Sequence, residues 1–120
     1  MRRENARLYR EGRWTSDGRM LVDTRLPDTA VPLLSDRQDT PGGDPTIGCV
    51  IDVRRGRRGW VIGTLFTYAD PWDLSGLACE ADFSSLKDAT RRSQGVVYAG
   101  GRLEAVTLGD RPCWKRMWLK

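Results

Sequence analysis

The strongest strand signal in this sequence is residues 59–68, which read GWVIGTLFTY. Aromatic and β-branched side chains dominate the run, and such residues suit the pleated, half-buried surface of a β-sheet. A second apolar run, residues 46–53, precedes it, and the basic segment Arg54–Arg58 separates the two. We therefore predict two neighbouring strands joined by an arginine-rich hairpin tip.

Shorter strand signals occur on both sides of this hairpin. They are residues 20–22, 30–34, 95–99 and 103–108. An Asp17-Gly18 turn precedes the first of them, and a Gly100-Gly101 turn is predicted to join the last two as a hairpin. Gly48, inside the run at 46–53, is predicted to mark a bulge or a close approach of another backbone.

The apolar pattern changes to helical spacing after Pro71. Apolar residues recur at intervals of three or four in residues 74–78 and again in residues 83–89. Ser84 or Ser85 is suited to cap a helix that runs to about Arg92. The predicted fold class is therefore β-rich α+β: a small barrel or a strongly curved, mostly antiparallel sheet of about six strands, with one or two helices.

A chain of 120 residues is expected to form one core. Residues 1–13 contain five arginines and few large apolar side chains, which favours a basic N-terminal arm or an edge segment, with a short helix as the alternative. Residues 14–120 are predicted to form a single β-rich domain. The apolar runs are too short to span a membrane, so no membrane partner is expected.

The sequence contains no histidine. Its absence removes Ser-His-Asp and Cys-His nucleophile systems and histidine general bases. The three cysteines, Cys49, Cys79 and Cys113, form no CxxC pair and are expected to be free thiols rather than zinc ligands. We therefore expect no catalysis, no cofactor and no metal; lysine, tyrosine or carboxylate catalysis is the alternative.

Two basic segments are candidate contact surfaces on a chain of net charge +4. The arginines of the hairpin tip could grip phosphate, nucleic acid or an acidic protein surface, or they could be a solvated turn that protects a sheet edge. Trp114 and Trp118 lie at i and i+4 among basic residues, which suits an anchor in a partner groove or docking onto the protein's own core. The candidate partner-binding residues are Arg2, Arg3, Arg54, Arg55, Arg57, Arg58, Trp114 and Trp118.

Three short apolar segments follow one another in a particular order. They are residues 31–37 (VPLLSDR), residues 47–50 (IGCV) followed by 59–63 (GWVIG), and residues 95–98 (GVVY) followed by 105–108 (AVTL) and Pro112. Together they cover roughly residues 18–113 and resemble the prohead maturation protease family of tailed phages, which is distantly similar to herpesvirus assemblin. The resemblance implies a barrel-like protease fold.

The same resemblance implies that the catalytic positions of the family are lost. The family's histidine falls on Arg37, its nucleophilic serine on Val97 and the acidic residue that supports the histidine on Ala105. Arginine stays protonated and valine carries no nucleophile, so no reaction path would remain. The chain would then be a degenerate, shortened relative that keeps the fold as a scaffold.

These observations lead to two expectations about function. The first is a non-catalytic phage structural protein that binds capsid protein or another head protein as a decoration, assembly or scaffolding component and forms oligomers through assembly. The second is a small basic protein that binds nucleic acid or inhibits a host defence protein. The expected location is the bacterial host cytoplasm during assembly, or the virion.

Overall fold

The computed structural model describes residues 2–15, 17–35, 46–68, 78–84, 88–109 and 118–119. These residues form strands and one short 3-10 turn. The elements are β1 (Arg2–Arg10), β2 (Arg19–Val22), β3 (Val31–Ser35), β4 (Thr46–Arg55), η2 (Arg57–Gly59), β5 (Trp60–Thr67), β6 (Ala78–Ser84), β7 (Asp88–Arg92), β8 (Gly95–Ala99), β9 (Arg102–Gly109) and β10 (Trp118–Leu119).

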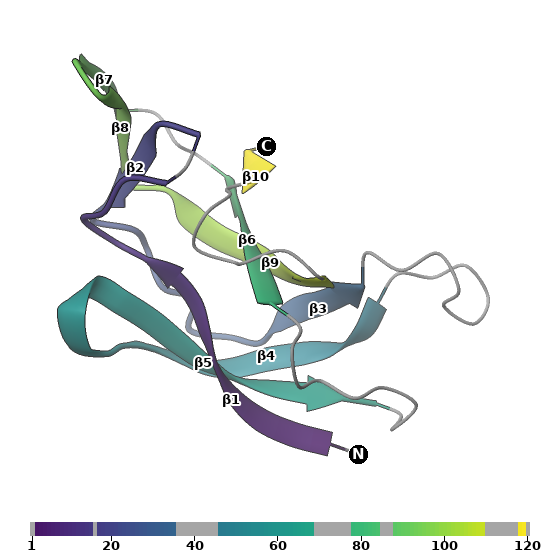
Figure 1. Cartoon of the computed structure of the whole chain (residues 1–120). Coiled ribbons are helices and arrows are strands. Elements are labelled where there is room, and N and C mark those ends of the chain that lie inside the picture. Colours follow the sequence, from purple (N-terminus) through teal and green to yellow (C-terminus); the bar gives the residue numbers. More distant parts are fainter. Residues whose placement is uncertain are drawn as a thin grey trace.

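The main sheet has the strand order β1-β5-β4-β3-β9-β6-β10. Most of its pairs are antiparallel, but β3 pairs with β9, and β6 with β10, in parallel. Its six longer strands curl into a half-barrel, so that β1 and β6 face each other across the core (Figure 1). The predicted β-rich, strongly curved and mostly antiparallel sheet is therefore confirmed.

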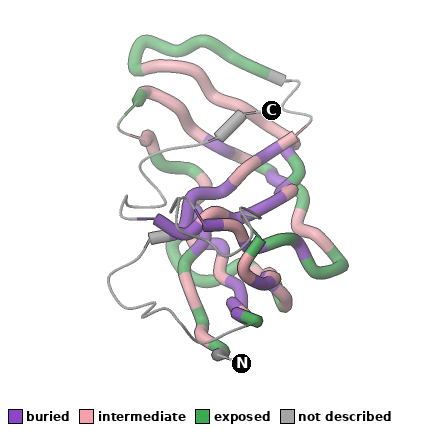
Figure 2. The backbone as a smooth tube through the Cα atoms, turned by 90° about the vertical axis from the view of Figure 1, so that its right-hand side faces the viewer, coloured by how far each residue is buried: buried purple, intermediate pink, exposed green. Residues whose placement is uncertain are grey.

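A second, three-stranded sheet has the order β2-β8-β7. It lies at one end of the half-barrel, where β7 and β8 extend away from the main sheet (Figure 1). Buried residues concentrate in the middle of the molecule, whereas β7 is exposed and β8 is half-buried (Figure 2). The small sheet therefore adds little to the core beyond Leu21 and the partly buried Tyr98.

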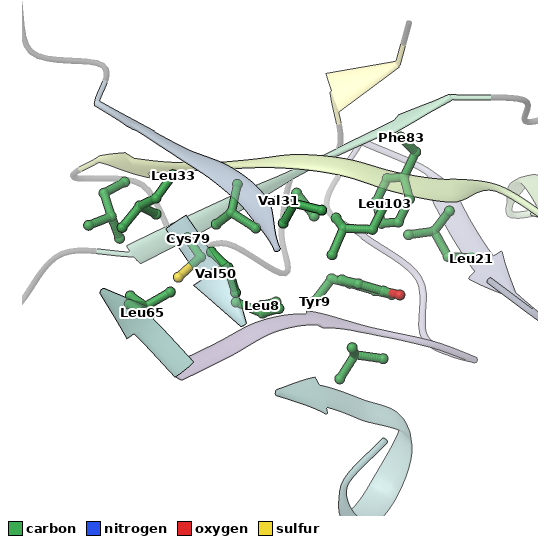
Figure 3. Packing of buried hydrophobic residues seen from close by; sticks show 14 residues of the cluster. Leu8, Tyr9, Leu21, Val31, Leu33, Val50, Leu65, Cys79, Phe83 and Leu103 are labelled. Atoms are coloured by element: carbon green, nitrogen blue, oxygen red, sulfur yellow. The ribbon is translucent and has the colours of Figure 1, made fainter. Parts of the chain in front are cut away.

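The core is built from the inward faces of the curled strands. In β5, Val61, Gly63, Leu65 and Thr67 are buried at alternate positions, as expected for a strand with one face on a core, and Thr64 between them is buried as well. Leu8 and Tyr9 of β1 point towards the side chains from β6 and β9 (Figure 3). The Tyr9 and Phe83 rings meet edge to face, with their centroids 4.8 Å apart, and thereby close the open side of the half-barrel.

No α-helix occurs among the described residues, so the helix predicted from Ser84 or Ser85 to Arg92 is wrong. Ser84 ends β6 and Arg92 ends β7. Cys79, Ala81 and Phe83 alternate towards the core, and this period of two competes with the helical spacing of residues 83–89. Antiparallel pairing of β6 with β9 decides between the two patterns. Residues 74–77 lie outside the described residues.

The sequence predicted that Gly100-Gly101 joins two strands as a hairpin, and this prediction is wrong. The Gly100-Gly101 step carries the chain from β8 in the small sheet to β9 in the main sheet. The Gly100 N–H donates to the carbonyl of Val22, and the Arg25 N–H donates to the carbonyl of Gly101. The positive φ of Gly100, 73°, suits this change of direction.

Gly48 is a site of close backbone approach, as predicted. A Cβ at this position would lie 1.7 Å from the carbonyl oxygen of Phe66 on β5. The register of β4 is irregular beside Gly48, where Ile47 is an additional residue opposite β3, and again between Ile51 and Arg54 opposite β5. Glycine is therefore required at residue 48 by the spacing of β4 and β5.

The N-terminal residues form the edge strand β1, which is the edge-segment alternative of the sequence prediction. Residues 2–10 pair antiparallel with β5, and Leu8 and Tyr9 are fully or almost fully buried. Residues 2–10 therefore form neither a helix nor an arm separate from the sheet. Pairing with β5 is possible because the apolar pair Leu8-Tyr9 anchors an otherwise polar strand.

Candidate anion-binding patch

A bulge in β1 places arginines on one face of the sheet. The register with β5 shifts between Arg7 and Tyr9, so that Leu8 is the additional residue. Leu8 and Tyr9 both point into the core, and Arg7 and Arg10 therefore both lie on the outward face. Without the bulge, strict alternation would place Arg7 and Arg10 on opposite faces.

Trp60 lies beneath these two arginines. It is the residue on β5 that pairs with Arg10. The guanidinium carbons of Arg7 and Arg10 lie 4.8 Å and 5.1 Å from the centroid of the Trp60 ring. Such cation–π contacts hold the guanidinium planes against the ring.

The β4–β5 turn brings further arginines to the same place. Arg58 has a left-handed conformation, with φ 56° and ψ 34°, and Gly59 follows with φ 82°. The Arg10 side chain donates to the carbonyl of Arg58, and the Glu11 N–H donates to the carbonyl of Gly59, at 2.8 Å and 2.7 Å. The turn is thereby tied to the end of β1.

We call Arg7, Arg10, Arg13, Arg57 and Arg58, together with Trp60, the arginine patch. All of these except Arg13 line a groove of about 420 Å³. Desolvation, and then the like charges of Arg13, Arg58 and Arg7, lower the pKa of Arg10. Within the described part of the chain, Arg10, Arg13, Arg57 and Arg58 form no ion pair with a carboxylate. The fold therefore concentrates positive charge that an anion would neutralise.

The turn arginines do not act as one group. Arg54 pairs with Asp52 at 3.2 Å. Arg55 pairs with Glu11 and also donates to the carbonyl of Thr24, at 2.6 Å. Both are therefore engaged within the protein, whereas Arg57 and Arg58 extend from the turn into the patch.

Glu11 is the centre of a polar network beside the patch. Its carboxylate accepts hydrogen bonds from the N–H and hydroxyl of Thr24 as well as from Arg55. Burial raises the pKa of Glu11, but the hydrogen bonds from Arg55 and Thr24 outweigh it, and the net pKa is lowered. The Tyr9 hydroxyl lies 2.6 Å from that of Thr24, and burial raises the pKa of Tyr9 to about 12.

The other candidate residues from the sequence are dispersed. Arg2 begins β1, and Arg3 is exposed on the same outward face as Arg7, with its guanidinium 5.3 Å from the Phe66 ring centroid. Trp118 begins β10, and Trp114 lies outside the described residues. Of the three positions that the protease resemblance implies to be degenerate, Val97 is in β8 and Ala105 is buried in β9, in different sheets, and Arg37 is not among the described residues.

Sequence reasoning missed Arg7, Arg10, Arg13 and Trp60 as members of one site. The alternation of Arg3, Asn5 and Arg7 was a usable signal for one face of a strand. Arg10 is out of phase with that alternation by one residue. Only the bulge at Leu8, which the tertiary structure creates, brings it into the patch.

Other ligand classes have less support in the described residues. No group of three or more His, Cys, Asp and Glu side chains is placed there to hold a metal ion. Cys79 is buried and Cys49 half-buried, and both are free thiols; Cys113 lies outside this part of the chain. No helix in the described ranges is long and apolar enough to cross a membrane.

No family model, no curated protein and no solved structure matches this chain. Function is therefore inferred from the geometry of the arginine patch.

Proposed function

We propose that this protein is a non-catalytic binding protein that holds an anionic macromolecule on its arginine patch. The observation that carries the proposal is the clustering of Arg7, Arg10, Arg57 and Arg58 around Trp60, in one groove. Desolvation, and then the like charges of neighbouring arginines, lower the pKa of Arg10, so the positive charges of the patch repel one another. An anionic ligand would relieve that repulsion and gain bidentate hydrogen bonds from guanidinium groups.

Retention on heparin, a sulfated polyanion, tests this proposal. The double variant Arg57→Glu/Arg58→Glu removes two positive charges from the patch. Arg91→Glu/Arg92→Glu is the matched control, because it changes the net charge equally on the exposed strand β7 of the other sheet. The patch variant is expected to elute at clearly lower salt than the control. Equal elution of the two variants would show that the patch is not the binding site.

The non-catalytic part of the proposal has its own test. The sequence contains no histidine, and the positions that align with the protease family's catalytic residues are Arg37, Val97 and Ala105. Incubation of the purified protein with casein and with a serine-reactive fluorophosphonate probe is expected to give neither cleavage nor labelling. Cleavage that persists through repeated purification would overturn this part.

Capsid protein is the proposed partner if the chain is a degenerate prohead-protease relative. The support for this partner is the ordered sequence segments at 31–37, 47–50 and 95–98. Cryo-electron microscopy of assembled heads, made with and without the protein, is expected to show additional density on the shell. Its absence from purified particles would remove capsid protein as the partner.

A further inference from the structure

A row of arginines continues from the patch along the whole outward face of β1. Arg3 and Arg7 alternate on this face, and the bulge at Leu8 adds Arg10. At about 3.3 Å per strand residue, the row from Arg3 to Arg10 is roughly 20 Å long. That length accommodates about four nucleotides, the lower end of site sizes for single-stranded nucleic acid on OB folds.

Aromatic rings of β5 lie under this row at both of its ends. The Arg3 guanidinium lies 5.3 Å from the Phe66 centroid, and those of Arg7 and Arg10 lie over Trp60. Asn5 lies between the ends, where it accepts a hydrogen bond from Thr64 at 3.0 Å. The face thus alternates fixed guanidinium planes with half-buried rings, and nucleobases stack on both kinds of surface.

We propose that the anionic partner is single-stranded nucleic acid, with its phosphodiester backbone running along β1 from Arg3 to the Arg57–Arg58 turn. This inference rests on the proposed function and specifies its ligand. A single strand carries one negative charge per nucleotide at regular intervals, which suits a row of arginines better than the irregular carboxylates of a protein surface.

The curvature of the sheet favours a single strand over a duplex. The outward face lies on the convex side of the half-barrel, because the core fills the concave side (Figure 3). A duplex is a stiff rod with its own convex surface, and would reach only a few arginines at a time. A flexible single strand can follow the curved face and expose its bases to Trp60 and Phe66.

The left-handed conformation of Arg58 supports a binding role for the turn. Left-handed φ and ψ are unfavourable for a residue other than glycine. Arg58 has no ion pair with any described carboxylate that would explain its presence in this conformation. Its side chain instead lines the groove beside Arg57, where a phosphate would contact both.

Fluorescence anisotropy with fluorescein-labelled dT12 tests the proposal. The variant Arg7→Gln/Arg10→Gln is expected to weaken binding at least tenfold, whereas Arg91→Gln/Arg92→Gln is expected to weaken it less than twofold. In a salt titration, the slope of log Kd against log salt should be smaller for Arg7→Gln/Arg10→Gln than for the wild type by about 1.4, because each of two lost phosphate contacts contributes about 0.7. Arg57→Gln/Arg58→Gly, which changes only the turn, provides a second patch variant if the first does not fold.

Two further probes separate the possible ligands. Trp60→Leu should weaken binding of dT12 more than binding of a labelled glutamate 20-mer, because both ligands lose the arginine positions that the ring holds but only nucleobases also lose a stacking surface. If the glutamate 20-mer or a 12-base-pair duplex binds the patch as tightly as dT12, the inference of a single-stranded ligand fails and the proposed function survives. If none of these probes binds and heparin retention is also independent of the patch, both fail.

Discussion

Glu11 and Arg55 form an ion pair, with 2.9 Å between Oε1 of the carboxylate and Nε of the guanidinium. The pair joins the residue that follows β1 to the last residue of β4, which are far apart in sequence. Thr24, in the segment between β2 and β3, completes the contact through its N–H, hydroxyl and carbonyl groups. Three chain segments thus meet at one carboxylate beside the arginine patch.

Replacing Glu11 by Gln is expected to lower the free energy of unfolding by about 2 kcal/mol. Hydrogen bonds to a charged group contribute about 1.5–3 kcal/mol, and the neutral amide would leave Arg55 and Thr24 incompletely paired. Urea denaturation measures the change. A midpoint equal to that of the wild type would show that the ion pair contributes nothing to stability.

Because of the same carboxylate, the stability of the protein is expected to fall at acid pH. The pKa of Glu11 is lower in the folded protein than its ordinary value of 4.5, so the unfolded chain binds the proton more readily. The stabilisation is therefore present above pH 4.5 and is lost as pH falls through the lower folded pKa. Urea midpoints measured between pH 3 and pH 7 should fall at the acid end more steeply for the wild type than for Glu11→Gln. Parallel curves would contradict this assignment.

Because Tyr9 is buried, the protein is expected to lose stability at alkaline pH. Burial raises the folded pKa of Tyr9 from 10.0 to about 12, and the hydroxyl therefore ionises first in the unfolded chain. Its contribution is complete below pH 10 and is lost as pH rises towards 12, by at most about 3 kcal/mol. Tyr9→Phe should remove most of this loss, at a cost of about 1 kcal/mol at pH 7 from the missing hydrogen bond to Thr24. Denaturation at pH 7 and pH 11 provides both values.

A methyl group at residue 48 is expected to be incompatible with the sheet. The Cβ of Gly48→Ala would meet the Phe66 carbonyl oxygen, so β4 and β5 would have to separate. The expected loss is about 3 kcal/mol or more, at the upper end of overpacking effects. Gly56→Ala is the control, because its nearest neighbours would lie at an ordinary 3.5 Å. Similar melting temperatures for the two variants would contradict the close approach.

Arg58→Gly is expected to separate stability from binding. Glycine adopts the left-handed conformation without strain, but it also increases the entropy of the unfolded chain. The free energy of unfolding should therefore stay unchanged or rise by up to about 1 kcal/mol, while retention on heparin falls. If the variant is less stable than the wild type but binds heparin equally well, Arg58 supports the turn and does not contact a ligand.

Much of the strand content could be predicted because it depends on residue types and spacing within short segments. The aromatic and β-branched residues of Trp60–Thr67 indicated β5, and the basic run before them indicated the β4–β5 turn. A helix from Ser84 or Ser85 to about Arg92 was predicted because the apolar spacing of residues 83–89 also matched a helical period. Strand pairing decided the outcome: β6 pairs with β9, which is distant in the chain, and β7 pairs with the next strand, β8.

By itself, the sequence determined the β-rich class, the glycine at residue 48 and the excess of arginine, since each depends on residue type or short-range spacing. Only the tertiary structure decided which arginines meet. Strand pairing turns Arg55 inwards to Glu11, and the bulge at Leu8 turns Arg10 outwards over Trp60. A shift of one residue in register reverses the face of every side chain that follows it, and the register of β1 is set by burial of Leu8 and Tyr9 against strands distant in the sequence.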